Sequence, residues 1–214
     1  MSPSIRFPTA VIVFLTLAVC CEFQSVAHAD GEEAPATAQG LCDALLASMK
    51  GGPSLDFTAR RNLLAPEVQR DLDLAFMTRI VVGPSWQGIS AGDRQQLVDA
   101  FSAYSIATYA HEFKSYSGEH FEVDPSPTQT PRGDCIVHTK LFTGDPQPVE
   151  LDYLMRKSGD RWRIIDVYLN GTISQMAARR SEYSTILRQG GAAALVGLLN
   201  KKTADLGDQR PGSS

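Results

Sequence analysis

The amino-acid sequence predicts an α+β domain, in which a four-stranded antiparallel meander sheet is flanked by N-terminal and C-terminal helices. Apolar residues recur at helical spacing from Leu41 to about residue 117. The period then changes to two over residues 121–169, which is typical of strands. Helical spacing returns from Thr172 to about Leu206. Because the sheet and the helices both present apolar faces, we expect an apolar cavity between them.

The N-terminal helices are bounded by glycine and proline. The first is expected over residues 41–49 and ends at Gly51-Gly52-Pro53. The second is expected over residues 56–64 and ends before Pro66, since proline disrupts a helix interior. The third covers residues 68–80.

The longest helix begins at a predicted capping box formed by Ser90 and Asp93. It is expected to end near Ser117-Gly118, and it carries a broad aromatic stripe. At the C-terminus, Gly190-Gly191 separates two further predicted helices, over residues 172–188 and 192–206.

Four segments between these helices have the period of strands. Short turns at residues 144–146 and 158–160 connect consecutive strands, which predicts an antiparallel meander. The expected strands cover residues 121–123, 134–142, 148–156 and 162–169.

Residues 1–29 are predicted to be a cleavable signal peptide. Arg6 precedes an apolar run over residues 10–19, and Ala27-His28-Ala29 fits an A-x-A cleavage site. The apolar run is short compared with the ~20 residues of a membrane-spanning helix. An uncleaved anchor, or a lipoprotein modified at Cys20, is the alternative. We therefore expect export to the periplasm, with a mature chain that begins at Asp30.

The mature chain is expected to form one domain over residues 41–206. The acidic, alanine-rich residues 30–40 read as a flexible N-terminus, and residues 207–214 read as a disordered tail. The chain has 20 basic and 24 acidic residues, a formal net charge of −4. Without a basic surplus, nucleic-acid binding is not expected.

The sequence lacks the motifs of common enzymes and metal sites. His111-Glu112 begins an H-E-x-x-H pattern, but Ser115 stands where the second histidine is required. No P-loop or G-x-S-x-G motif is present, so no catalytic residue, metal site or cofactor is expected. One alternative stays open, a small-ligand enzyme or binding module that uses Asp166 together with Tyr153 or Tyr168.

Two cysteines remain in the mature chain, Cys42 and Cys135. An oxidising compartment permits a disulfide between them. Two buried, unpaired thiols are the alternative.

The aromatic helix and two strands supply a candidate binding surface. Residues four apart share a helix face, and residues two apart share a strand face. Gly171 allows a turn that folds the following helix back over the sheet. The predicted lining residues are Tyr109, Phe113, Val137, Tyr153, Val167, Leu169, Ile173 and Met176.

Several motifs, in order, resemble the MlaC-like, or toluene-tolerance, family. The segment Val82-Gly83-Pro84-Ser85-Trp86 is followed by a helix that carries Gln95 and Phe101. The stretch Trp162 to Gly171 is similar to the family's W-x-x-x-D-V-x-x-x-G strand, and Ser174 follows it as in the family. The resemblance covers residues 41–199. The sequence of residues 164–175, together with Arg179-Arg180, is most similar to the hopanoid-associated HpnM branch.

This resemblance implies a periplasmic lipid carrier without enzymatic activity. The implied ligand is a hopanoid or a phospholipid, carried between the inner and outer membranes. The implied partner is an inner-membrane lipid transporter, either an RND-type hopanoid exporter or an ABC-type complex. We expect a monomer that docks transiently at the membrane surface.

Overall fold

The computed structural model describes residues 27–208, with side chains from residue 33 onward. Residues 1–26, which hold most of the expected signal peptide, and residues 209–214 lie outside the described part. The helices are α1 (Ala27–Gly51), η1 (Gly52–Ser54), α2 (Phe57–Asp71), α3 (Leu74–Val82), η2 (Gly83–Gly88), α4 (Ala91–Glu112) and α5 (Gln175–Asp208). The strands are β1 (His120–Val123), β2 (Thr128–Gln129), β3 (Cys135–Val137), β4 (Thr139–Phe142), β5 (Val149–Ser158), β6 (Arg161–Leu169) and β7 (Ile173–Ser174).

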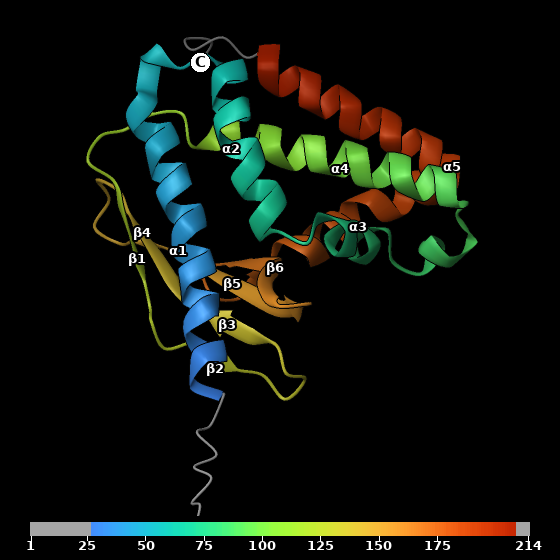
Figure 1. Ribbon diagram of the computed structural model, residues 1–214. Helices are drawn as coiled ribbons and strands as arrows, with labels where there is room; N and C mark the ends of the chain where they lie inside the picture. The colour runs from blue at the N-terminus through green and yellow to red at the C-terminus, as the bar shows by residue number, and fades with distance from the viewer. Residues whose placement is uncertain (1–26, 209–214) are drawn as a thin grey trace, which may run out of the picture.

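The predicted α+β architecture is confirmed, with helices before and after an antiparallel sheet (Figure 1). The sheet has seven strands rather than four. The expected strand over residues 134–142 is divided at His138 into β3 and β4, which pair with successive parts of β5. The short strands β2 and β7 were not predicted, because two residues are too few to show a period.

The long strand β5 organises the sheet. Tyr153 of β5 pairs with Val137 of β3 on one edge and with Val167 of β6 on the other. The β5–β6 pairing is antiparallel and is interrupted by a register shift between Leu154 and Met155. A bulge of this kind strengthens the local twist, so the sheet curls.

Helix α1 begins before the expected first helix. The segment over residues 30–40, expected to be flexible, belongs to α1, and Ala34 and Ala38 are fully buried. Alanine has the highest helix propensity, and its small side chain permits close packing. The helix runs along the sheet and contacts β1, β3 and β6 (Figure 1). The alanine-rich composition therefore marks a packed helix.

The boundary between α2 and α3 also differs from the expectation. Pro66 lies inside α2, which continues to Asp71. The helix ends where Leu72 forms a parallel bridge with Ile164 of β6, and the amide of Asp73 donates to the Ile164 carbonyl at 2.9 Å. The Asp73 carboxylate then accepts from the amide of Phe76 and caps α3. Contact with the sheet therefore determines where α2 ends and α3 begins.

The two long helices expected after residue 90 are present with different ends: α4 ends at Glu112 rather than near Ser117-Gly118, and α5 begins at Gln175 rather than at Thr172. Ser90 caps α4, because its hydroxyl accepts from the amide of Asp93 at 3.1 Å and donates to the Asp93 carboxylate at 2.7 Å. Helix α5 contains a kink at Gly191, where φ is 64°, so it consists of the two expected helices. Helices α4 and α5 lie side by side (Figure 1).

The buried core joins α1, α2 and α4 to the inner face of the sheet. Cys42 and Cys135 are both buried in it as free thiols. The fully buried members include Leu41, Leu45, Leu64, Val68, Phe101, Val137, Met155 and Ile164.

Candidate functional site

A cavity of about 450 Å³ lies between the inner face of the sheet and the helices. One wall consists of strand side chains that alternate along β5 and β6. The opposite wall is formed by the last two turns of α4, the first turns of α5, and the α2–α3 junction. The lining residues are Leu72, Met77, Ser105, Thr108, Tyr109, Glu112, Phe113, Leu141, Val149, Leu151, Tyr153, Val167, Leu169, Gln175, Met176 and Arg179.

Most of the residues proposed from the sequence meet in this cavity. They come from α4, β5, β6 and α5, and the helix and strand periodicities bring them to one place. The rings of Tyr109 and Phe113 lie 6.0 Å apart. The six predicted residues that line the cavity are Tyr109, Phe113, Tyr153, Val167, Leu169 and Met176.

Two predicted residues lie elsewhere. Val137 is fully buried on β3, which contacts α1, and it does not line the cavity. Ile173 is 52% exposed, because residues 173–174 form β7 and α5 begins only at Gln175. The turn at Gly171 therefore leads into a strand rather than directly into a helix.

The sequence reasoning missed other lining residues that share faces with the predicted ones. Leu141, Val149 and Leu151 belong to the same strand faces as Tyr153. On α4, Ser105 and Glu112 lie four residues before and three residues after Tyr109 and share its face, and Thr108 lies three residues after Ser105 and four before Glu112. An extension of the periodicity would have found these, whereas Leu72 and Met77 reach the cavity through the unpredicted α2–α3 break.

Two phenols, those of the buried Tyr153 and the half-buried Tyr109, supply polar groups to the cavity. Burial raises the pKa of Tyr109 to about 12, although the nearby Arg179 lowers it. Burial also raises the pKa of Tyr153 well above its usual value. The Tyr153 hydroxyl lies 3.9 Å from the Cys42 thiol, whose pKa burial raises to about 12. All three groups are neutral at pH 7, so none is suited to act as a base.

Arg179 is the cation among the lining residues. Its guanidinium lies 5.1 Å from the centre of the Tyr104 ring and 3.5 Å from the Tyr183 hydroxyl. Burial lowers the pKa of Arg179, but Tyr183 and Tyr104 outweigh that effect and raise it. The side chain therefore carries a positive charge beside a mainly apolar space.

Asp166 connects β6 to α5. Its carboxylate accepts hydrogen bonds from the Ser174 hydroxyl at 2.5 Å, the Val167 amide at 2.8 Å and the Met176 amide at 3.1 Å. Asp166 does not line the cavity. Its position therefore explains the geometry of the turn and gives no support to the alternative in which Asp166 acts with Tyr153 or Tyr168.

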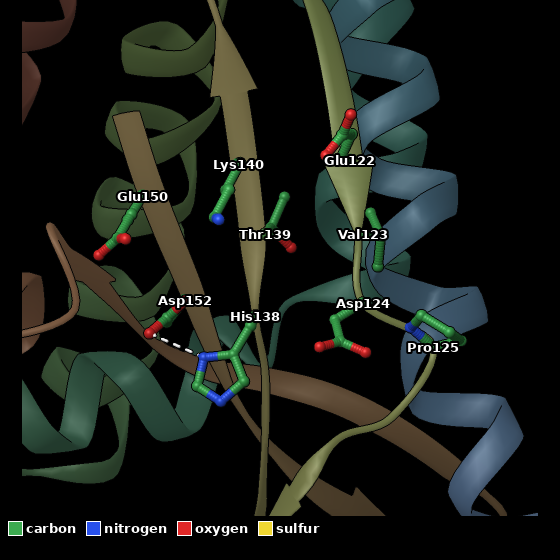
Figure 2. Close-up of a pocket in the computed structure, with 9 residues that line it drawn as sticks. All are labelled: Glu122, Val123, Asp124, Pro125, His138, Thr139, Lys140, Glu150 and Asp152. Atoms are coloured by element: carbon green, nitrogen blue, oxygen red, sulfur yellow. Dashed lines mark ion pairs between the residues drawn. The ribbon is translucent and has the colours of Figure 1, made fainter. Parts of the chain in front are cut away.

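A second hollow, of about 510 Å³, lies on the outer face of the sheet (Figure 2). Lys140 of β4 lies opposite Glu122 of β1 and Glu150 of β5, so the charges alternate across the strands. His138 is held by Asp152 at 3.1 Å, as Figure 2 shows. This lining is polar and charged, which does not suit an apolar ligand.

Within residues 27–208, no group of histidine, cysteine and acidic side chains is arranged to hold a metal ion. In the same part of the chain, no helix combines the length and the apolar character needed to cross a bilayer.

A model of the MlaC protein family matches residues 39–201 of the chain. The chain belongs to the MlaC family. The resemblance seen in the sequence motifs is thereby confirmed at the level of the family. A search of curated proteins finds no match.

The chain is also similar to a solved structure of the phospholipid-binding protein from Ralstonia solanacearum in complex with a phospholipid. The two are 25% identical, and the TM-score is 0.70. The match covers 81% of this chain and 98% of the other. The family and this neighbour together indicate a lipid-binding protein.

Proposed function

We propose that this protein is a periplasmic lipid carrier that binds apolar lipid tails in the cavity and shuttles lipid between the inner and outer membranes. The mainly apolar cavity of about 450 Å³ carries the proposal. The solved relative that holds a phospholipid supports it. Export to the periplasm is supported by the family match and by the A-x-A site at Ala27-His28-Ala29.

Burial of a tail supplies enough free energy for such binding. Each CH₂ group removed from water contributes ~0.8 kcal/mol, so a tail of ~16 carbons corresponds to about 13 kcal/mol before ordering costs. A lipid therefore needs no covalent step to be held. We place the polar headgroup where the exposed Glu112 and the half-buried Gln175 line the cavity.

The ligand is a phospholipid or a hopanoid. The solved relative supports a phospholipid, while the likeness of residues 164–175 and Arg179-Arg180 to the HpnM branch supports a hopanoid. An inner-membrane transporter, ABC-type for the first ligand or RND-type for the second, exchanges lipid with the carrier. The carrier acts as a monomer that docks transiently at the membrane surface.

The Val167→Trp variant tests whether the cavity holds the lipid. Val167 lines the cavity, so an indole there occupies space that a tail would fill. We expect native mass spectrometry of the variant, purified from the bacterial envelope, to show folded protein without lipid. The mass of the ligand on the unaltered protein distinguishes a phospholipid from a hopanoid.

Ile173→Trp is the matched control. Ile173 is 52% exposed and lies outside the cavity, so this variant should keep its lipid. A folded Val167→Trp protein with a full complement of lipid would contradict the assignment of the cavity.

A further inference from the structure

A third hollow, of about 540 Å³, opens where α3, η2, α4 and α5 meet. Three arginines from three different helices line it, together with the aromatic ring of Trp86. We call it the arginine hollow and define it by Arg79, Ile80, Gly83, Pro84, Trp86, Gln87, Arg94 and Arg180. It is separate from the lipid cavity and shares no lining residue with it.

Among the residues that the structure describes, the three guanidinium groups of the hollow have no carboxylate partner. Arg94 donates to the carbonyl oxygens of Trp86 and Gln87, both at 3.0 Å, and lies over the Trp86 ring. Arg79 lies 5.8 Å from the centre of the Phe76 ring. Among residues 27–208, neither of these arginines nor Arg180 forms an ion pair. Three unpaired cations therefore gather on one surface of a chain whose net charge is −4.

The guanidinium of Arg180 packs against Gly83. Gly83 has a φ of 66°, and a Cβ atom there would lie 2.7 Å from the Nε atom of Arg180. Only glycine leaves room for this approach and adopts this backbone conformation without strain. The side chain is thereby held at the hollow although it is exposed.

The first turns of α5 separate the arginine hollow from the lipid cavity. Gln175, Met176 and Arg179 line the cavity, whereas Arg180 lines the hollow. The adjacent residues Arg179 and Arg180 therefore face two different spaces. Anything bound in the hollow contacts the same helix that forms a wall of the lipid cavity.

We propose that the arginine hollow is the docking site for a carboxylate-bearing segment of a protein partner in lipid transfer. The proposal rests on the proposed carrier function. Guanidinium groups bind carboxylates through paired, charge-assisted hydrogen bonds, and such sites set the specificity and rate of association. Docking here places the partner against the α5 wall, beside the lipid.

The shape and composition of the hollow favour a protein over a bilayer. Membrane-binding surfaces project apolar anchors beside their cations. The exposed large apolar side chains of the described residues, Leu63, Tyr116 and Ile173, are not part of the hollow. A concave surface instead admits protruding side chains, and the net charge of −4 opposes approach to an anionic bilayer.

Co-sedimentation with membrane vesicles tests the proposal. The Arg79→Glu/Arg180→Glu variant is compared with the unaltered protein on three targets: intact vesicles of the native envelope, protease-treated vesicles, and liposomes of the extracted lipids. Arg132→Glu, at an exposed residue between β2 and β3, is the control for a charge reversal outside the hollow. Circular dichroism checks the folding of each variant, and Arg180→Gln repeats the test with a milder change.

We expect the unaltered protein and Arg132→Glu to bind intact vesicles and to lose binding in high salt. The double variant should bind at least tenfold more weakly, and Arg180→Gln should show an intermediate loss. If charge reversal weakened binding to liposomes or to protease-treated vesicles as much as binding to intact vesicles, the hollow would be a membrane-docking site and the proposal would be overturned. Absence of binding by the unaltered protein, or no effect of charge reversal, would also overturn it.

The lipid content of the same samples, measured by mass spectrometry, tests the carrier function separately. The double variant should contain as much lipid as the unaltered protein, because the hollow and the cavity share no lining residue. A protein without lipid would contradict the carrier function, whichever result the sedimentation gives.

Discussion

Asp166 lies in an apolar strand, and its hydrogen-bond donors define its structural role. The carboxylate is 7% exposed and accepts from one hydroxyl and two backbone amides at the start of α5. Such an arrangement stabilises a helix start, because the free amides of the first turn need acceptors. From the sequence alone, a lone carboxylate in an apolar strand leaves a catalytic acid open as the alternative.

We expect Asp166→Asn to destabilise the fold by about 1.5–3 kcal/mol, which is typical for the loss of charge-assisted hydrogen bonds. Urea denaturation followed by circular dichroism measures this change. Asp160→Asn is the control, since Asp160 is exposed in the β5–β6 turn and should change stability by less than about 0.5 kcal/mol. Equal effects of the two substitutions would argue against the structural role of Asp166.

The phenols of Tyr109 and Tyr153 predict a loss of stability in alkaline solution. The usual pKa of tyrosine is 10.0, whereas that of Tyr109 in the folded protein is about 12 and that of Tyr153 is raised well above 10.0. Unfolded chains therefore release these protons at lower pH than the folded protein does. The contribution to stability is complete below pH 10 and is lost as the pH rises toward 12.

Tyr153→Phe should reduce this pH dependence, because phenylalanine has no proton to lose. Urea midpoints measured between pH 8 and pH 12 should fall less steeply for this variant than for the unaltered protein. Tyr116→Phe changes an exposed ring and should leave the slope as it is. An unchanged slope for Tyr153→Phe would contradict the assignment.

At the scale of elements, α1 shows how composition can mislead. The residues 30–40 are acidic and alanine-rich, and their sequence has no obvious apolar period. Alanine is nevertheless small enough to be buried where a helix lies close to strands, as Ala34 and Ala38 are. A pattern based on large apolar residues does not detect this kind of contact.

Ala38→Asp should destabilise the protein by at least about 2 kcal/mol, because it places an unpaired charge in a fully buried position. Ala36→Asp is the matched control, in the same helix but exposed, and should have an effect below about 0.5 kcal/mol. Thermal unfolding measures both. If the two variants were equally stable, the N-terminal part of α1 would not be packed on the domain.

Periodicity predicted the long elements and missed the contacts between distant ones. The capping box at Ser90, the strands β5 and β6 and the glycine kink in α5 all have local signals, and the structure contains them. The break between α2 and α3 has no local sequence signal, since it depends on a bridge between Leu72 and Ile164. For the same reason, Leu72 and Met77 were absent from the predicted cavity.

At the scale of the whole molecule, the cavity exists because the curled sheet and the helices are not packed directly onto each other everywhere. The sheet and α1 form a solid core on one side, where Val137 is fully buried. On the other side, α4 and α5 stand over β5 and β6 and leave about 450 Å³ between them. Interiors of proteins are normally close-packed. A mainly apolar space of this size is therefore expected to be occupied in the functional protein.

Removal of the bound lipid should consequently lower the stability of the protein. A ligand that binds only the folded state stabilises it by RT ln(1 + [L]/Kd), which is about 2.7 kcal/mol when the ligand is present at 100 times its Kd. We expect delipidated protein to melt at a lower temperature than protein purified from the envelope. Added phosphatidylglycerol should restore the melting temperature if a phospholipid is the ligand.

Val167→Trp provides the decisive comparison for this effect, because its indole fills part of the space that the lipid would occupy. Its melting temperature should be the same before and after delipidation and should not respond to added lipid. Ile173→Trp, with a side chain outside the cavity, should behave as the unaltered protein does. If delipidation destabilised Val167→Trp and the unaltered protein by the same amount, the stabilising lipid would have to bind somewhere other than between the sheet and α4.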